Sequence, residues 1–250
     1  MGMHLTHLLR IFFALGVVSA SFAGPISFNG YDISNAVLTG NGNWAHTFDG
    51  TITPGVNFTN FTNPGTTATY SGVGSGTLND GVIGASISNS QLFVTPGAEN
   101  PPDPTFVPVE PEIILTLSHP YTINTIEIFG GDIPNNAIPG AITGVTIGLI
   151  AFDFSFHQET FLTEGFGTVL SSVGVQVNDR VTLTGSTLEG IPAVAVSLFA
   201  FQGNVSNWIS ITEITLDGDR FVPSNPIPEP TTGLLAAFAL AALVWRGSQR

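Results

Sequence analysis

The side chains able to do acid–base or nucleophilic chemistry are few, and they are spaced in no catalytic pattern. The body of the chain has three histidines, His46, His119 and His157, none of them in a His-x-His or His-Glu-x-x-His arrangement. The glycine-rich string at residues 72–76 places its serine outside the position that a nucleophile elbow requires. With 18 acidic residues in the chain, some pair of carboxylates will meet the spacing of a glycosidase by chance. The sequence therefore predicts that the protein is not an enzyme, and a secreted hydrolase is kept only as the last alternative.

One aromatic residue in a turn is a candidate for contact with a ligand. Binding sites combine aromatic side chains with a few convergent polar groups. Residues 41–44 read Asn-Gly-Asn-Trp, so Trp44 follows a turn-like stretch and its indole could be exposed as a platform for a sugar ring. The alternative is a core tryptophan at the start of a strand.

The charge balance excludes two classes of partner. The chain of 250 residues contains five arginines and no lysine against 18 acidic residues, a net charge of −13. A nucleic-acid-binding protein needs a basic patch to replace phosphate counterions, and an anionic membrane surface would repel the acidic body. The absence of cysteine from the sequence excludes disulfides, thiolate catalysis and cysteine-bound zinc. Stability must therefore come from one large apolar core, for which a hydrophobic content of 43% is ample.

The body reads as a succession of β-strands separated by Gly, Asn, Pro and Asp at short spacing. The segments rich in β-branched and aromatic residues are 113–117, 125–129, 145–150, 180–184, 194–201 and 208–216. In the last segment, alternation places Glu213 on the same face as Ile209 and Ile211. Residues 95–112 contain six prolines and are expected to form an extended loop, or else a linker. Because no helical period is found, we expect an all-β fold, a single antiparallel β-sandwich over residues 24–222.

Three stretches of the body resemble discoidin, or coagulation-factor type C, domains. Residues 68–81 end in Leu-Asn-Asp-Gly and are similar to the stretch that opens these domains. Residues 114–132 resemble their central pair of strands, joined by a turn with Pro-Tyr, and residues 209–218 resemble their last strand. The resemblance covers residues 66–218 and implies a galactose-binding-like jelly roll. An expected Trp after the Asp-Gly pair, an Asp-Leu-Gly motif and an Asp-Gly-x-x-Trp turn are all missing, so the resemblance concerns the fold and not a ligand.

The same resemblance implies a metal position. Domains of this fold often hold a structural calcium ion between the Asp-Gly loop and the final strand, and the matching residues here are Asp80 and Glu213. Calcium prefers carboxylate and carbonyl oxygens, and an acidic exported chain suits it. The alternative is that Asp80 only shapes a turn before Gly81 and that Glu213 is a solvated strand residue. No cofactor other than structural calcium is expected.

The two ends of the chain read as export and membrane-insertion segments. Residues 1–23 have a weakly basic start, an apolar run and small residues before a cleavage site after Ala23, which predicts a signal peptide removed by signal peptidase. A cut after Ala20 or a buried N-terminal helix is the alternative. Residues 231–245 contain no charged side chain and are followed by Arg246. At about 1.5 Å per residue this run is short of a hydrocarbon core of about 30 Å, so we expect a marginal transmembrane helix in the precursor. A core helix is disfavoured because the run has no polar face.

The order of features at the C-terminus resembles a sorting signal. Pro228, Glu229 and Pro230 precede the apolar span, and Arg246 follows it near the end of the chain. This order is similar to the PEP-CTERM signal of Gram-negative bacteria and occupies residues 223–250. The resemblance implies recognition by an exosortase, a membrane-embedded cysteine transpeptidase, in a host that makes exopolysaccharide.

These features predict an exported, non-enzymatic surface or extracellular-matrix protein. It would cross the inner membrane of a Gram-negative bacterium, be processed by exosortase, and act in biofilm or exopolysaccharide association. The alternative is a carbohydrate-binding module that recognises the host exopolysaccharide. The expected partners are signal peptidase, exosortase and the exopolysaccharide, with no nucleic acid.

Overall fold

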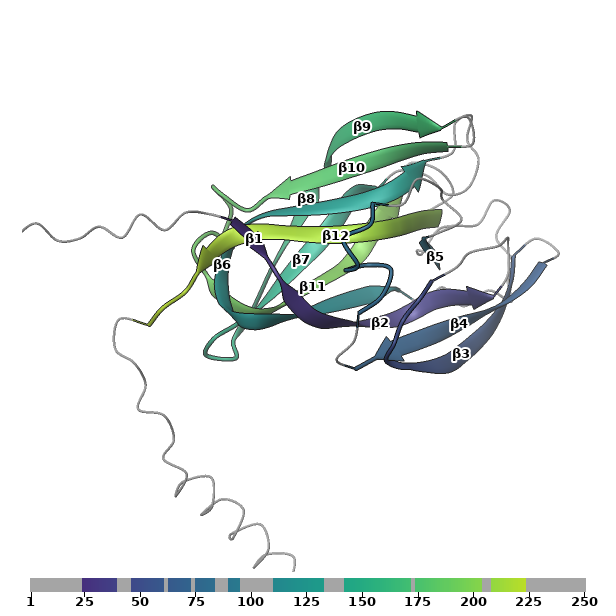
Figure 1. The fold of residues 1–250 in the computed structure, drawn as a ribbon, viewed down its shortest axis with the longest axis horizontal. Coiled ribbons are helices and arrows are strands. Elements are labelled where there is room, and N and C mark those ends of the chain that lie inside the picture. Colours follow the sequence, from purple (N-terminus) through teal and green to yellow (C-terminus); the bar gives the residue numbers. More distant parts are fainter. Residues whose placement is uncertain are drawn as a thin grey trace, which may run out of the picture. The chain divides into compact units, whose positions relative to one another are not determined.

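A computed structural model of the chain describes residues 24–39, 46–60, 63–72, 75–83, 90–94, 110–132, 142–171, 174–203 and 208–223. Within these residues the chain forms strands and no helix (Figure 1). The strands are β1 (Gly24–Ile26), β2 (Phe28–Thr39), β3 (Thr51–Asn60), β4 (Asn63–Ser71), β5 (Gln91–Val94), β6 (Glu112–Asp132), β7 (Ile142–Ala151), β8 (Phe156–Leu162), β9 (Glu164–Ser171), β10 (Gly174–Thr182), β11 (Pro192–Gly203) and β12 (Trp208–Arg220).

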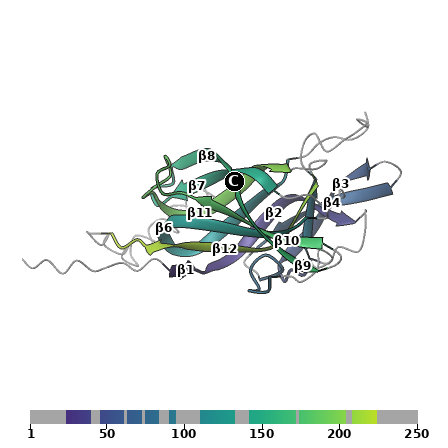
Figure 2. The same cartoon turned by 90° about the horizontal axis from the view of Figure 1, so that it is seen from above.

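The long strand β6 takes part in both layers of the fold. Its first half pairs with β2 on one side and β11 on the other, giving a layer in the order β3-β4-β2-β6-β11-β7-β8. Its second half pairs with β12 on one side and β10 on the other, with β9 beyond β10. β1 and β5 pair with the two ends of the other edge of β12. All of these pairings are antiparallel, and Figure 2 shows the strands from above.

β6 changes partners through a bulge, not through a break in the chain. Residues 117–120 lie opposite the single residue Val194 of β11, and an excess of residues on one strand bends it. The excess includes Pro120, which has no N–H for a ladder hydrogen bond. The two strands joined by a turn that the discoidin resemblance implies are therefore one continuous strand here, bent at the expected place.

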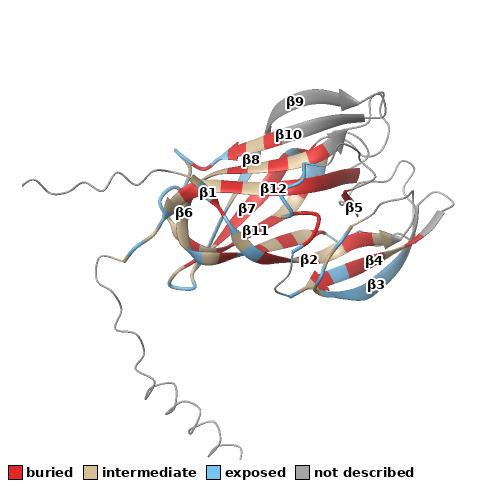
Figure 3. Ribbon diagram, in the orientation of Figure 1, coloured by how far each residue is buried: buried red, intermediate tan, exposed pale blue. Residues whose placement is uncertain are grey.

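The inner faces of the two layers share one core (Figure 3). Side chains from β2, β6, β7 and β11 meet side chains from the second half of β6 and from β12 in a single buried cluster. Fully buried members include Ile33, Ile113, Leu115, Ile147, Leu149, Val196, Leu198, Ile126, Ile128, Ile214 and Leu216. The predicted all-β antiparallel sandwich is confirmed.

Two details of the strand prediction are wrong. Strict alternation along β12 fails because a register shift between Ile211 and Glu213 inserts one extra residue, so that Ile211 and Ile214 are both in the core. The strand expected over residues 180–184 ends at Thr182, although the Leu183 N–H still donates to the Asn124 carbonyl of β6 at 2.8 Å.

The chain divides into two compact units, residues 1–220 and 221–250, and the sandwich lies in the first. The described residues include no helix long and apolar enough to cross a membrane. The segments predicted as the signal peptide and the apolar span lie outside the described residues. So do Trp44, Pro228, Glu229, Pro230 and Arg246.

Candidate functional site

The Asp80 turn, residues 77–83, fills a gap along the edge of β12. β5 and β1 pair with the two ends of this edge and leave its middle unpaired. There the Ile214 N–H donates to the Leu78 carbonyl at 3.1 Å, and the Gly81 N–H donates to Glu213 Oε2 at 3.1 Å. Gly81 has a φ of 76°, a left-handed conformation that glycine adopts without steric cost. The last strand therefore holds the turn through both a backbone and a side-chain contact.

Asp80 and Glu213 lie together at this turn. Glu213 is only 3% exposed, which excludes the solvated strand residue considered as the alternative. Burial, and to a smaller extent charge repulsion from the neighbouring Asp80 carboxylate, raises the pKa of Glu213 to about 7. Asp80 itself is exposed, and its Oδ1 accepts the Val82 N–H at 2.7 Å. The Gly81 N–H favours the ionised form of Glu213, and a positive partner would favour it further against burial and the second carboxylate.

The chemistry of this pair fits a calcium ion. Both side chains offer hard oxygen donors, which calcium prefers, and the ion would neutralise the buried carboxylate. Asp80 and Glu213 are the residues that would hold it. The described part of the chain has no group of three or more His, Cys, Asp or Glu side chains suited to a metal. Any further ligands from the described residues would thus be carbonyl or hydroxyl oxygens, with water completing the shell. The calcium ion remains a prediction.

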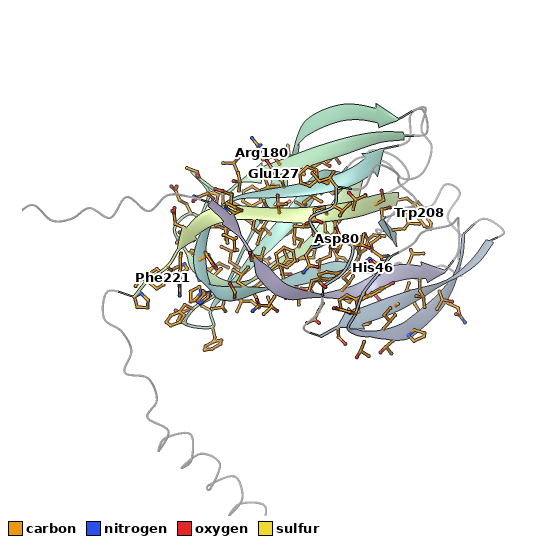
Figure 4. All side chains as sticks on the ribbon, in the orientation of Figure 1. His46, Asp80, Glu127, Arg180, Trp208 and Phe221 are labelled. Carbon is orange, nitrogen blue, oxygen red and sulfur yellow. The ribbon has the colours of Figure 1, made fainter. Side chains whose placement is uncertain are left out.

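An aromatic cluster supports the Asp80 turn. The Tyr31 hydroxyl hydrogen-bonds His46 Nε2 at 3.0 Å. The ring centroid of Phe48 lies 5.1 Å from that of Tyr31, and the ring centroid of Tyr70 lies 4.6 Å from that of His46. Tyr31 also hydrogen-bonds the backbone of Leu78 in the turn. Figure 4 labels His46 and Asp80 in the same part of the sandwich. Burial lowers the pKa of His46 to about 4, so the imidazole is neutral at physiological pH.

The cluster leaves no room at Gly76. A Cβ there would lie 2.2 Å from the Thr47 carbonyl oxygen and 2.3 Å from the Tyr31 hydroxyl oxygen. The Gly76 N–H donates to Asn79 Oδ1 at 2.8 Å, and the Thr77 N–H donates to the Thr47 carbonyl at 2.9 Å. The approach of these backbones therefore requires glycine at this position.

A second feature, the aromatic turn (residues 151–157), joins β7 to β8 and displays two phenylalanines. Phe154 is 84% exposed and has a φ of 65°, which is uncommon for a bulky residue. Phe156 is 53% exposed, and its ring packs over Gly148, where a Cβ would lie 2.6 Å from ring atoms. The Phe154 N–H donates to the Ala151 carbonyl at 2.9 Å, which closes the turn. Two large apolar side chains are therefore exposed at one turn, and contiguous apolar surface is a feature of interaction sites.

The polar residues of the aromatic turn form a short hydrogen-bonded chain. Ser155 donates to Asp153 Oδ1 through its hydroxyl at 2.6 Å and through its N–H at 3.0 Å. The Ser155 hydroxyl also lies 2.8 Å from His157 Nε2. Asp153 therefore contacts the serine and not the histidine, so the order of a catalytic triad, in which the acid orients the base, is not formed.

Other aromatic and charged residues complete the picture. Tyr31 and Tyr70 of the aromatic cluster, and Trp208 of β12, are core residues between 1% and 2% exposed. His119 is exposed beside Tyr121, with ring centroids 6.4 Å apart. Arg180 of β10 forms an ion pair with Glu127 of β6, both labelled in Figure 4.

Sequence reasoning missed Phe154. Its signal was the string Asp-Phe-Ser-Phe-His at residues 153–157, in which turn-forming residues alternate with phenylalanine. An isolated phenylalanine between strands is normally assigned to the core. Its exposure depends on the backbone conformation of the turn.

No protein-family model matches the chain, and no curated protein matches it. Solved structures do. The family 32 CBM (carbohydrate-binding module) of Clostridium perfringens NanJ in complex with galactose is 16% identical with a TM-score of 0.34, over 56% of this chain and 82% of that one. CBM32-3 from a family 31 glycoside hydrolase of Clostridium perfringens is 16% identical with a TM-score of 0.34, over 57% and 81%. The C-terminal domain of a chitobiase from Bacteroides fragilis is 15% identical with a TM-score of 0.35, over 58% and 80%.

Proposed function

We propose that this protein is an exported, non-enzymatic carbohydrate-binding protein of a bacterial cell surface, and that its β-sandwich contacts polysaccharide through the aromatic turn. The observation that carries the proposal is Phe154, a large apolar side chain 84% exposed at the tip of a hairpin. A left-handed conformation costs a non-glycine residue about 1–2 kcal/mol, and strain of this kind collects at functional sites. Contact between the Phe154 ring and a ligand would account for a phenylalanine at this position despite that conformational cost.

The surroundings of Phe154 suit a sugar. Phe156 adds a second exposed ring, backed by Gly148. Asp153 and His157 add hydrogen-bonding groups that Ser155 holds in place. Aromatic surface with a few fixed polar groups is the composition of small-molecule binding sites.

Two further considerations support the export part of the proposal and the absence of catalysis. The predicted signal peptide would direct the chain across the inner membrane, and the PEP-CTERM-like sequence around Pro228, Glu229 and Pro230 would have it processed there by exosortase. Among the described residues, no carboxylate hydrogen-bonds the other ring nitrogen of His157, so we assign the Ser155–His157 contact to binding and not to an activated nucleophile. We therefore place the protein in the exopolysaccharide or biofilm matrix, as a binder of its polysaccharide.

The test is binding of the exported protein to a panel of neutral and acidic polysaccharides, including the host exopolysaccharide, by affinity electrophoresis. Phe154→Gly removes the ring and also removes the left-handed strain, so the fold should be retained. The matched control is Leu162→Ala, an 81% exposed apolar residue at the far end of β8, about 20 Å along the strand.

We expect wild type and Leu162→Ala to bind at least one polysaccharide equally, and Phe154→Gly to bind it at least about tenfold more weakly. If no polysaccharide in the panel retards the wild-type protein, the carbohydrate-binding function is wrong. The protein would then be a matrix component without a glycan ligand.

A further inference from the structure

We infer that the aromatic turn selects neutral, hydroxyl-rich glycan chains and rejects glycans that carry carboxylate or sulfate groups. This inference rests on the proposed carbohydrate-binding function and specifies its ligand class. It comes from the direction of the hydrogen bonds within the turn and from the charges around it.

The turn offers hydrogen-bond acceptors to a ligand. The single hydroxyl proton of Ser155 goes to Asp153 Oδ1 at 2.6 Å, so at 2.8 Å the serine oxygen must accept from His157 Nε2–H. A neutral imidazole protonated at Nε2 has a lone pair on Nδ1. Asp153 Oδ1 already accepts two hydrogen bonds from Ser155. Its second oxygen, Oδ2, accepts neither of these two bonds. Asp153 Oδ2 and, where the imidazole carries no proton on it, His157 Nδ1 are therefore the acceptors that the residues next to Phe154 in the chain offer to a ligand.

The charge around the turn is negative. Hydrogen bonds from the Ser155 side chain and backbone lower the pKa of Asp153, and those from Thr187 lower the pKa of Glu159 on the same strand as His157. Both carboxylates are therefore ionised at neutral pH.

Neither arginine of the described residues lies at the turn. Arg180 pairs with Glu127 in the other layer. Arg220 of β12 lies opposite Tyr121 of β6. Tyr121 lies opposite Ala193 of β11, and Ala193 lies opposite Ala151 of β7, where the turn begins. Arg220 is thus three strand spacings from the start of the turn, about 14 Å at about 4.8 Å each.

Acceptors and negative charge together decide the ligand class. A sugar hydroxyl donates to either acceptor, and its ring can lie against Phe154. A uronate or sulfate group has only acceptor oxygens at neutral pH. It could therefore donate no hydrogen bond to the acceptors of the turn, and its negative charge would lie beside two carboxylates. Like charges brought together at an interface are a common means of rejecting wrong partners.

The experiment compares one polysaccharide with its own charged derivative, using the full exported chain. The neutral polysaccharide that binds most strongly in the panel is oxidised selectively at its primary hydroxyls to carboxylates. Part of the oxidised sample is then methyl-esterified, which removes the charge again. We expect the oxidised form to bind at least about tenfold more weakly, and the ester to regain most of the lost affinity. The difference should persist in 1 M salt, where the Debye length is about 3 Å, because the missing donors are unaffected by screening.

Two variants connect the selectivity to the turn. Asp153→Asn keeps an oxygen that can accept from Ser155 but replaces the ionised oxygen by an N–H donor. It should reduce the preference for the neutral over the oxidised form to less than about threefold. Leu162→Ala should leave the preference unchanged.

The outcomes separate this inference from the proposed function. Binding of the oxidised form as strong as that of the neutral form would overturn the selectivity while leaving carbohydrate binding intact. So would panel binding confined to acidic polysaccharides, or an Asp153→Asn preference equal to that of wild type. A wild-type protein that binds no polysaccharide would overturn both.

Discussion

Replacing Glu213 by glutamine should stabilise the calcium-free protein at alkaline pH, although it removes a buried side chain that accepts a hydrogen bond. Glutamine is nearly isosteric, and its carbonyl oxygen can still accept the Gly81 N–H that Glu213 Oε2 accepts at 3.1 Å. What is lost is a buried negative charge beside Asp80. Because the pKa of Glu213 is raised from 4.5 to about 7, the folded state binds more protons than the unfolded state between these values. The wild type therefore loses stability as pH rises from about 4.5 to about 7.

The magnitude follows from this difference in pKa. Relative to a side chain that is neutral at every pH, ionisation of Glu213 costs the folded state about 1 kcal/mol at pH 5 and about 3 kcal/mol at pH 8. The stability of Glu213→Gln relative to wild type should therefore increase by about 2 kcal/mol from pH 5 to pH 8.

Urea unfolding at pH 5 and pH 8 in the presence of a chelator measures this change, with the fluorescence of buried Trp208 as the signal. Comparing variant with wild type at each pH cancels the titration of His46, which has the opposite sign. Asp80→Asn is a useful second variant, because removing the Asp80 charge lowers the cost of ionising Glu213 and should flatten the wild-type pH dependence.

A stability difference between Glu213→Gln and wild type that does not change between pH 5 and pH 8 would refute this reasoning. Calcium adds a second criterion. If Asp80 and Glu213 hold the ion, calcium at about 100 times its dissociation constant should stabilise the wild type by about 2.7 kcal/mol. Glu213→Gln and Asp80→Ala should gain little. A wild-type melting temperature that ignores the chelator would contradict the calcium prediction and leave the pH prediction standing.

Three other outcomes are expected. Gly76→Ala should destabilise the fold by about 1–3 kcal/mol or more, measured by urea unfolding, because a Cβ meets a backbone carbonyl at 2.2 Å. Lowering the pH from about 6.5 to about 4 should destabilise the wild type through His46, since the unfolded state then binds more protons than the folded state. His46→Phe should lose this part of the pH dependence. If the free energy of unfolding of His46→Phe changes with pH as steeply as that of wild type, this prediction is contradicted. Changing Pro228 or Glu229 to alanine should leave an unprocessed, membrane-held precursor. Intact-protein mass spectrometry decides this last prediction, which is wrong if exported wild type retains residues 245–250.

The sequence was sufficient for the fold class because its pattern is local and repeated. Runs of β-branched residues separated by turn-forming residues predicted most of the strands, including 113–117, 125–129 and 194–201, and each of these three falls within an observed strand. The apolar content and the absence of cysteine required one large core, and the buried cluster shared by both layers is that core. The residues that resembled an Asp-Gly loop and a final strand also indicated that Asp80 and Glu213 belong near each other.

Only the tertiary structure decided how Glu213 and Phe154 are used. Strict alternation placed Glu213 on a regular face, but a register shift in β12 and the Asp80 turn bury it, and both depend on contacts between residues far apart in the chain. Phenylalanine is buried on average, whereas a left-handed turn exposes Phe154. Hydrophobic pattern reports which residues prefer burial on average. The exposure of a particular side chain depends on register and turn geometry, which are set only when distant strands pair.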